Sequence, residues 1–332
     1  MASLSKKLIG FEQIFITLKE NLINKTLSNS LIFYGNKGIG KSTLAYSLIN
    51  NVFDEIYKEN TSSNHTNLIY NNSHPNVRVL RKEYDEKTKK YKNNITINQI
   101  RELESFIYQF SFDGSPKFII IDSSDDLNIN SANALLKILE EPKKNINIIL
   151  ITHHLSRLLP TINSRCIKFK FSNPTLDQFN EIILHHHELI DQNIVKFLYD
   201  LSNGSPGLAI ELHSKNIRET FDHLFTIFKE KKPLSSSILQ LSYKVGTYTN
   251  DQFIIYLSLI KFILVNTIKI NIGIDIKKNF VSDLSIYLLE LSEYLDNDVS
   301  TNILEYLNVH ENDLFVYNLD KKIFSLNIFS SL

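Results

Sequence analysis

One short segment constrains this chain more than any other. Residues 35–43 read G-N-K-G-I-G-K-S-T, which matches the phosphate-binding pattern G-x-x-x-x-G-K-S. An apolar run at residues 31–34 precedes it as a buried strand would, and residues 44–49 follow it as a helix. A strand, a glycine-rich turn and a helix start place several backbone N–H groups around one point, where the helix dipole favours an anion. The pattern therefore predicts a phosphate-binding loop (P-loop) rather than an ordinary glycine-rich turn.

The residues of this loop have distinct expected roles. The Lys41 ammonium is expected to reach the β- and γ-phosphates of a nucleotide, and the Ser42 hydroxyl to bind Mg²⁺. We therefore expect ATP or ADP, together with Mg²⁺, as the ligand. The predicted nucleotide-binding residues of the loop are Gly35, Lys37, Gly38, Ile39, Gly40, Lys41, Ser42 and Thr43.

Composition limits the other kinds of site. The chain has 332 residues, enough for two or three domains, and its formal net charge is zero. No global field therefore draws it to nucleic acid or to a membrane. Cys166 is the single cysteine, which excludes a disulfide within the chain and a cysteine-based zinc site, and which fits a reducing cytoplasm. The first residues carry no long apolar run, so we expect no signal peptide.

The apolar stretch at residues 253–270 raises the question of a membrane span. Lys261, Asn266 and Lys269 interrupt it, and no basic flanks mark an orientation. We therefore expect a buried helix of a bundle, and no membrane partner.

The order of the expected elements predicts the fold class. Apolar runs that fit strands alternate with stretches that fit helices between residues 30 and 171. Such alternation predicts an α/β fold with a doubly wound, five-stranded parallel sheet, whose ligands lie at the carboxyl ends of the strands. The last strand alternates with period two, as an edge strand would. The expected strands are residues 31–34, 77–80, 117–122, 146–152 and 167–171.

Shorter signals mark individual elements. Thr96 and Gln99 have the spacing of a capping box, which predicts a helix start. Residues 81–92 are densely charged with mixed signs, so we expect a solvated hairpin or loop, with a DNA-contacting arm as the alternative. Residues 58–76 are rich in Asn, Ser, Thr and His and are expected to form a surface loop. After residue 174 the pattern becomes helical.

Three motifs follow one another in the second half of this α/β region. Asp122 ends the third expected strand, residues 131–142 read S-A-N-A-L-L-K-I-L-E-E-P, and residues 158–166 read L-L-P-T-I-N-S-R-C. With these motifs the chain resembles the bacterial clamp-loader subunits of DNA polymerase III, and among them the delta-prime type in its alphaproteobacterial form. The resemblance covers residues 1–212 well and the rest weakly, mainly through N-L-D-K-K at residues 318–322. Further supporting segments are residues 74–76, 84–87, 95–97 and 122–126.

The resemblance implies an architecture and a set of partners. It implies an AAA+ P-loop domain at residues 1–172, a helical lid at 173–212 and an all-α collar, which assembles the oligomer, at 213–332. The partners would be the delta subunit and three copies of gamma or tau, in an open heteropentameric ring. That ring opens the beta sliding clamp and places it on primed DNA during replication, in the cytoplasm. DNA-directed DNA polymerase activity would belong to a different subunit of the holoenzyme.

The resemblance also completes the expected nucleotide site and reveals what that site lacks. Asp122 would bind Mg²⁺ together with Ser42, and Thr152 matches the polar residue at the end of the fourth strand. Where ATPase members carry a glutamate after the strand aspartate, this chain has Ser123, a poor base at neutral pH. The lid segment G-S-x-R, whose arginine senses the γ-phosphate, reads G-S-P-G here and ends in Gly207. The four-cysteine zinc site of many relatives is also missing.

These departures lead to three hypotheses. The first is a clamp-loader subunit that binds nucleotide without hydrolysing it. The second is an active ATPase of the gamma or tau kind that keeps hydrolysis through Asp125 or Asp126, although both lie too far along the chain to align with the glutamate. The third is an interaction protein with an empty loop.

Arg165, within the S-R-C triplet, is the expected catalytic residue. An arginine at a domain edge can enter a neighbour's ATP site, and such a finger contributes on the order of 10³ to 10⁵ in rate. The alternative is a surface arginine in an ion pair. Because the triplet follows the fourth strand, we expect Arg165 at the ligand-binding edge of the sheet, acting in trans on a neighbouring subunit.

Overall fold

The structure is a computed structural model that describes residues 8–24, 26, 28–57, 65–86, 90–109, 114–141, 143, 145–186, 190–233, 235–317, 319–330 and 332. Contacts within the chain divide it into two compact units, Met1–Glu181 and Ile182–Leu332. Each unit has its own elements and is described by itself.

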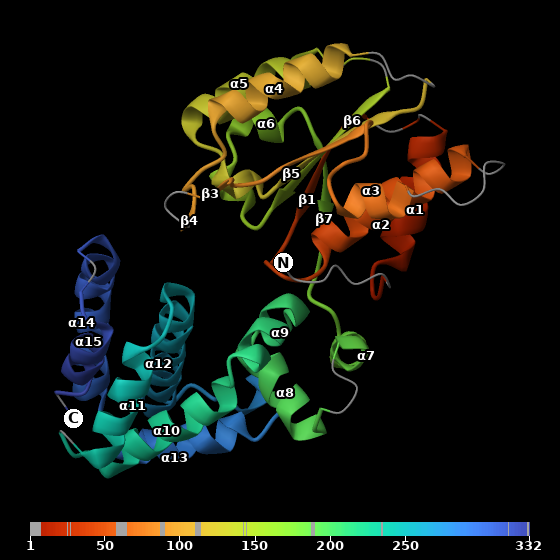
Figure 1. Cartoon of the computed structure of the whole chain (residues 1–332). Coiled ribbons are helices and arrows are strands. Elements are labelled where there is room, and N and C mark those ends of the chain that lie inside the picture. The colour runs from red at the N-terminus through yellow and green to blue at the C-terminus, as the bar shows by residue number, and fades with distance from the viewer. Residues whose placement is uncertain are drawn as a thin grey trace. The chain divides into compact units, whose positions relative to one another are not determined.

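A five-stranded parallel sheet forms the centre of the first unit (Figure 1). Its strand order is β2-β5-β6-β1-β7, so the strand before the P-loop lies between β6 and β7. The predicted α/β fold and all five predicted strands are confirmed, and β7 is an edge strand as its period-two pattern indicated. The strands are β1 (Ser30–Tyr34), β2 (Val77–Leu80), β5 (Lys117–Asp122), β6 (Ile146–Thr152) and β7 (Ile167–Lys170).

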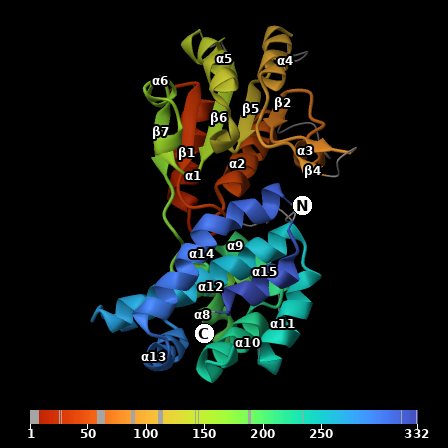
Figure 2. The ribbon, with the colours of Figure 1, turned by 90° about the vertical axis from the view of Figure 1, so that its left-hand side faces the viewer.

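Helices cover both faces of the sheet (Figures 1 and 2). Because side chains alternate along a strand, Phe33 packs into the core beneath α1, α2 and α3, whereas Ile32 packs into the core beneath α4 and α5. Strands buried on both faces read as continuous apolar runs, which is why the sequence revealed them. The helices are α1 (Glu12–Ile23), α2 (Lys41–Ile56), α3 (His65–Tyr70), α4 (Ile97–Tyr108), α5 (Ile129–Glu140) and α6 (Pro160–Asn163).

The register of the sheet aligns the carboxyl ends of its strands. Tyr34 of β1 lies opposite Thr152 of β6, and Asp122 of β5 lies opposite Ile151. Leu80, the last residue of β2, lies opposite Ile121. The residues that follow these strands are therefore brought to one edge of the sheet, where the P-loop begins.

The predictions for individual elements are confirmed, with a small shift in the residue at which α5 begins. The capping box is present: Gln99 N donates to Thr96 Oγ1, and Thr96 N donates to Gln99 Oε1. α5 begins before the predicted residue 131, because Asn128 caps it by accepting from the Ser131 N–H. The charged residues 81–92 include the predicted hairpin, β3 (Tyr84–Asp85) with β4 (Lys90–Tyr91).

One predicted loop differs in the structure, and parts of three predicted motifs fall outside the described residues. The predicted surface loop at residues 58–76 contains a short helix, α3, which packs against α2, so that part of the prediction is wrong. Ile69 of α3 is fully buried, which supplies the reason. Pro142, Lys87 and Asn318, which belonged to predicted motifs, lie outside the described residues.

The second unit is helical. Among the described residues, α12 is the helix long and apolar enough to cross a membrane, by length and composition only. It packs against α13 and α14, and Leu257, Ile260 and Leu264 are fully buried, as in the core helix of a bundle. The helices are α8 (Gln192–Leu201), α9 (Pro206–Ser214), α10 (Ile217–Glu230), α11 (Ser236–Gly246), α12 (Asn250–Asn271), α13 (Leu284–Tyr294), α14 (Asn297–Val316) and α15 (Lys321–Ile328).

The boundary between the two units falls inside α7 (Leu176–His186). The expected division into residues 1–172, 173–212 and 213–332 stays a prediction.

Replacing Thr96 with alanine should destabilise the first unit, because α4 loses the side-chain oxygen that accepts from its third amide. We expect the free energy of unfolding to fall by about 1 kcal/mol. Urea denaturation followed by circular dichroism measures it. Thr161→Ala, at an exposed threonine of α6, is the control and should change stability by less than about 0.5 kcal/mol. Equal stability of Thr96→Ala and wild type would show that the box contributes nothing.

Candidate nucleotide site

The glycines of the P-loop are required by its backbone. Gly38 and Gly40 have φ of 80° and 101°, in the left-handed region that favours glycine. At Gly35 a Cβ would lie 2.3 Å from the Phe171 carbonyl oxygen, because the loop passes directly over the end of β7. The side chain of Ile39 is buried in the core with Leu44 and anchors the loop to the unit. The loop conformation therefore follows from the sequence pattern.

The loop delivers the chain into the amino end of α2. Gly40 is the N-cap residue and no side chain caps this helix. The first amides of a helix have no partner within it, and the helix dipole adds a partial positive charge there. The N–H groups of Lys41, Ser42 and Thr43 open this helix, so its amino end suits a phosphate group. Lys37 and Gly38, at the tip of the loop, are exposed.

Lys41 is buried within the loop, with 3% of its surface exposed. Its ammonium donates to the carbonyl oxygens of Gly35 and Asn36, each at 2.6 Å. Burial lowers the pKa of Lys41 to about 8, although the nearby carboxylates of Asp122 and Asp125 oppose the shift. A cation that is shielded from water interacts strongly with an anion, so the Lys41 ammonium is suited to bind a phosphate group.

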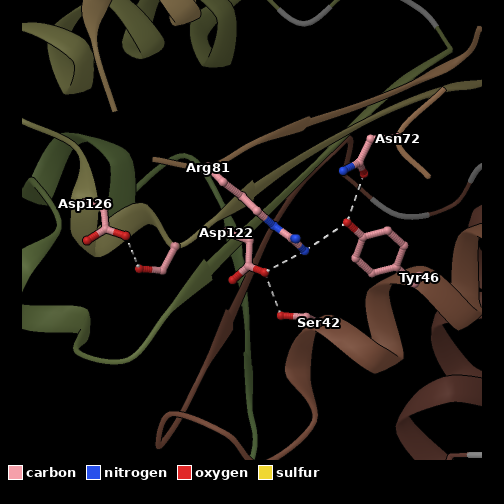
Figure 3. A network of polar contacts seen from close by, with 7 residues as sticks. Ser42, Tyr46, Asn72, Arg81, Asp122 and Asp126 are labelled. Carbon is pink, nitrogen blue, oxygen red and sulfur yellow. Dashed lines mark hydrogen bonds and ion pairs between the residues drawn. The ribbon is translucent and has the colours of Figure 1, made fainter. Parts of the chain in front are cut away.

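Ser42 and Asp122 meet as predicted. The Ser42 hydroxyl donates to Asp122 Oδ2 at 2.9 Å across the gap between α2 and β5 (Figure 3). A hydroxyl and a carboxylate are the oxygen ligands that hold Mg²⁺ beside the phosphates in P-loop proteins. The donor set therefore fits a magnesium ion of a bound nucleotide. Elsewhere in the part of the chain that the structure describes, no group of three or more His, Cys, Asp or Glu side chains could hold a metal ion.

A cation that the sequence analysis missed shares this carboxylate. Arg81 Nη2 lies 3.3 Å from Asp122 Oδ2, and it donates to the Tyr46 hydroxyl at 3.0 Å (Figure 3). Arg81 follows directly after β2, whose last residue pairs with Ile121. The rule that ligands gather at the carboxyl ends of parallel strands would have pointed to it.

Asp125 is engaged by the last side chain of β6 and by two backbone N–H groups directly after that strand. It accepts from the Thr152 hydroxyl at 3.1 Å and from the N–H groups of His153 and His154 at 2.6 and 3.1 Å. Burial alone would raise the pKa of Asp125, but these hydrogen bonds and the His153 imidazole outweigh it, so the pKa is lowered. Thr152 thus lies at the predicted strand end and helps to hold Asp125.

Asp126 and Ser123 also bind each other rather than facing a free space. Ser123 Oγ donates to Asp126 Oδ2 at 3.3 Å, and the Lys82 ammonium lies 3.2 Å from Asp126 Oδ1. The residue that replaces the glutamate is therefore a buried hydroxyl engaged with its own turn.

Arg165 lies apart from all these residues, and its predicted place is wrong. It lies two residues before Ile167, the first residue of β7, which runs parallel to β1 with Ile167 opposite Leu31. It therefore lies at the amino edge of the sheet, opposite to the edge that carries the P-loop. Arg165 follows β6 in chain order, but a residue before a parallel strand lies at that strand's amino end. Arg165 is exposed; its Nη2 pairs with Glu140 Oε1 at 2.8 Å and its Nη1 donates to the Thr161 carbonyl oxygen at 2.9 Å.

Known proteins share this sequence pattern. A DNA polymerase III subunit delta′ of Pseudomonas aeruginosa is 36% identical over 147 residues, which cover 44% of this chain and 43% of that protein. The corresponding subunit of Escherichia coli is 28% identical over 187 residues, which cover 55% and 50%. The chain thus matches about half the length of these relatives or less.

One solved protein structure has a backbone path similar to that of this chain. It is a DNA polymerase III gamma subunit-related protein from Thermotoga maritima, with 18% identity over 95% of this chain and 97% of that one. The TM-score is 0.48. The family model described as "DNA polymerase III, delta subunit" matches residues 10–175, half of the chain and the whole of the P-loop sheet. The resemblance to delta-prime subunits is thereby confirmed, and the chain belongs to the DNA polymerase III delta subunit family.

Proposed function

We propose that this chain acts as the delta-prime subunit of a clamp loader. In that role it would join the delta subunit and gamma or tau in a heteropentameric ring in the cytoplasm, and help to load the beta sliding clamp onto primed DNA. The relatives named delta′ support this role. The three-domain organisation, with a lid at residues 173–212 and a collar at 213–332, belongs to the same proposal.

We propose further that the site binds ATP or ADP and does not hydrolyse it; Ser42 and Asp122 are the residues that would hold a Mg²⁺ ion accompanying the nucleotide. The observation that carries this proposal is that the acidic residues near the P-loop are already engaged by other groups of the protein. The P-loop and Lys41 are intact, but Asp125 and Asp126 are both engaged in hydrogen bonds or ion pairs of the protein. Without a free carboxylate near Ser123, no described side chain of that turn is available to orient an attacking water. This disfavours the alternative of an active gamma-like ATPase.

The proposal also assigns Arg165 as an arginine finger in trans. Its place at the amino edge of the sheet supports a target outside its own P-loop, which lies at the opposite edge. The ion pair with Glu140 is exposed, and such pairs contribute little stability, so the guanidinium can leave it at low cost.

Nucleotide binding should depend on the charge of Lys41. Lys41→Ala should lose at least about tenfold in ADP affinity, because a buried charged partner of the phosphates is removed. In wild type the affinity should fall as pH rises through about 8, where the free lysine loses its proton. The variant should show no such fall. Isothermal titration calorimetry measures both, with Lys19→Ala, at a lysine paired with Glu55 on the surface, as the control. Equal affinity of Lys41→Ala and wild type would contradict a working phosphate site.

The isolated chain should show no ATP turnover above background. Asp125→Asn should instead reduce stability by roughly 1–3 kcal/mol near neutral pH, because charged hydrogen bonds from Thr152 and from the two amides after β6 are weakened. Since the folded-state pKa of Asp125 is lowered, this difference should shrink as pH falls through that value. Asp54→Asn, at an exposed aspartate, is the matched control. Turnover by wild type that Lys41→Ala and Asp125→Asn both abolish would instead establish the active ATPase.

Arg165→Ala should lower clamp- and DNA-stimulated ATP turnover of a reconstituted ring by on the order of 10³-fold at the neighbouring site, without preventing assembly. Arg165→Lys should rescue poorly, because an ammonium lacks the planar fork. Glu140→Gln removes the partner in the ion pair but keeps the arginine, and should turn over like wild type. If Arg165→Ala rings assemble and hydrolyse ATP at the wild-type rate, the arginine only holds Glu140.

A further inference from the structure

Arg81 occupies an unusual place for a cation in a P-loop site. Its Nη2 contacts Asp122 Oδ2 at 3.3 Å, and the Ser42 hydroxyl donates to the same oxygen at 2.9 Å (Figure 3). In hydrolysing P-loop proteins, a serine or threonine of the loop and an aspartate at a strand end hold the magnesium ion between them. The Arg81 guanidinium therefore contacts the same carboxylate oxygen of Asp122 that the Ser42 hydroxyl binds.

The Arg81 side chain and the Arg81 backbone are each held by a hydrogen-bonded neighbour. The Tyr46 hydroxyl accepts from Nη2 at 3.0 Å and donates onward to Asn72 Oδ1 at 3.3 Å (Figure 3). Tyr46 lies one helical turn after Ser42 on α2 and is 1% exposed, so its position is set by core packing. On the backbone side, Gln99 Nε2 donates to the Arg81 carbonyl oxygen at 2.9 Å.

The local charges explain why such a cation matters. Asp122 is mostly buried, and a carboxylate in that position repels the phosphates of a nucleotide unless a cation compensates it. A metal ion usually does so. Here the Arg81 guanidinium already compensates the charge of Asp122, and it would also repel a divalent cation that approached the same oxygen.

We propose that Arg81 takes, at Asp122, the charge-compensating position of Mg²⁺, so that the metal contributes little to nucleotide binding at this site. Arg81 is a positioning residue: it acts through Asp122. This inference rests on the proposed binding of nucleotide and adds to it that the bound form needs little metal. It also agrees with a site that retains nucleotide without hydrolysing it, because the metal is the group that neutralises charge on the reacting phosphates.

The test is the magnesium dependence of ADP binding to the full chain, measured by calorimetry in Mg²⁺ and in EDTA. For wild type we expect the two affinities to agree within about threefold. For Arg81→Met, which keeps the length of the side chain but removes its charge, we expect ADP to bind at least about tenfold more tightly with Mg²⁺ than with EDTA. Asp122 then lacks its internal cation and recruits the metal.

Two further variants separate charge from structure. Arg101→Met removes an arginine from the exposed face of α4 and should leave the magnesium dependence at the wild-type value. Arg81→Lys keeps a cation beside Asp122 and should stay closer to wild type than Arg81→Met does. A merely structural role of Arg81 would change stability in both Arg81 variants but would not change the ratio of the two affinities.

The outcomes decide the two proposals separately. Wild-type binding that is strongly dependent on Mg²⁺ overturns the role of Arg81 and leaves the proposed nucleotide site standing. Absence of binding by wild type, with binding of Mg-ADP by Arg81→Met, overturns nucleotide binding by the native chain and with it the proposed role of Arg81. If neither protein binds ADP under either condition, both proposals fail.

Discussion

The carboxylate of Asp122 is the group on which the chemistry of this edge depends. It receives a hydrogen bond from Ser42 of α2 and an ion pair from Arg81 at the end of β2, so side chains from two other elements converge on it. That convergence is possible because the strands are parallel and in register, with their carboxyl ends at one level. The sheet thus builds a site that is balanced in charge, with Lys41 and Arg81 facing acidic groups, and open to an anion at the amino end of α2.

The acidic residues beyond Asp122 hold the turn together. Asp125 binds two amides of the chain after β6, and Asp126 binds Lys82 and Ser123. A carboxylate engaged in this way has lone pairs directed at protein donors rather than at a water molecule. The site therefore combines an intact phosphate loop with carboxylates that are engaged by other groups of the protein.

The two edges of the sheet differ in what they present. One carries the P-loop with Lys41, and the other carries Arg165 beside Glu140. A chain with its phosphate loop at one edge and an exposed arginine at the other can contribute to two different sites when copies or relatives are arranged around a ring. Arg165 therefore lies away from the P-loop of its own chain.

The sequence by itself determined the fold class and the loop. Strands buried on both faces need continuous apolar runs, and the P-loop needs glycine at positive φ, as at Gly40, so both are written into short segments. The capping box at Thr96 is equally local, and only the start of α5 moved, because Asn128 offered an earlier cap. The partners of Arg81, the engagement of Asp125 and the edge at which Arg165 lies were decided by the tertiary structure alone. Each depends on strand order and register, which join residues far apart in the chain and leave no pattern within a single segment.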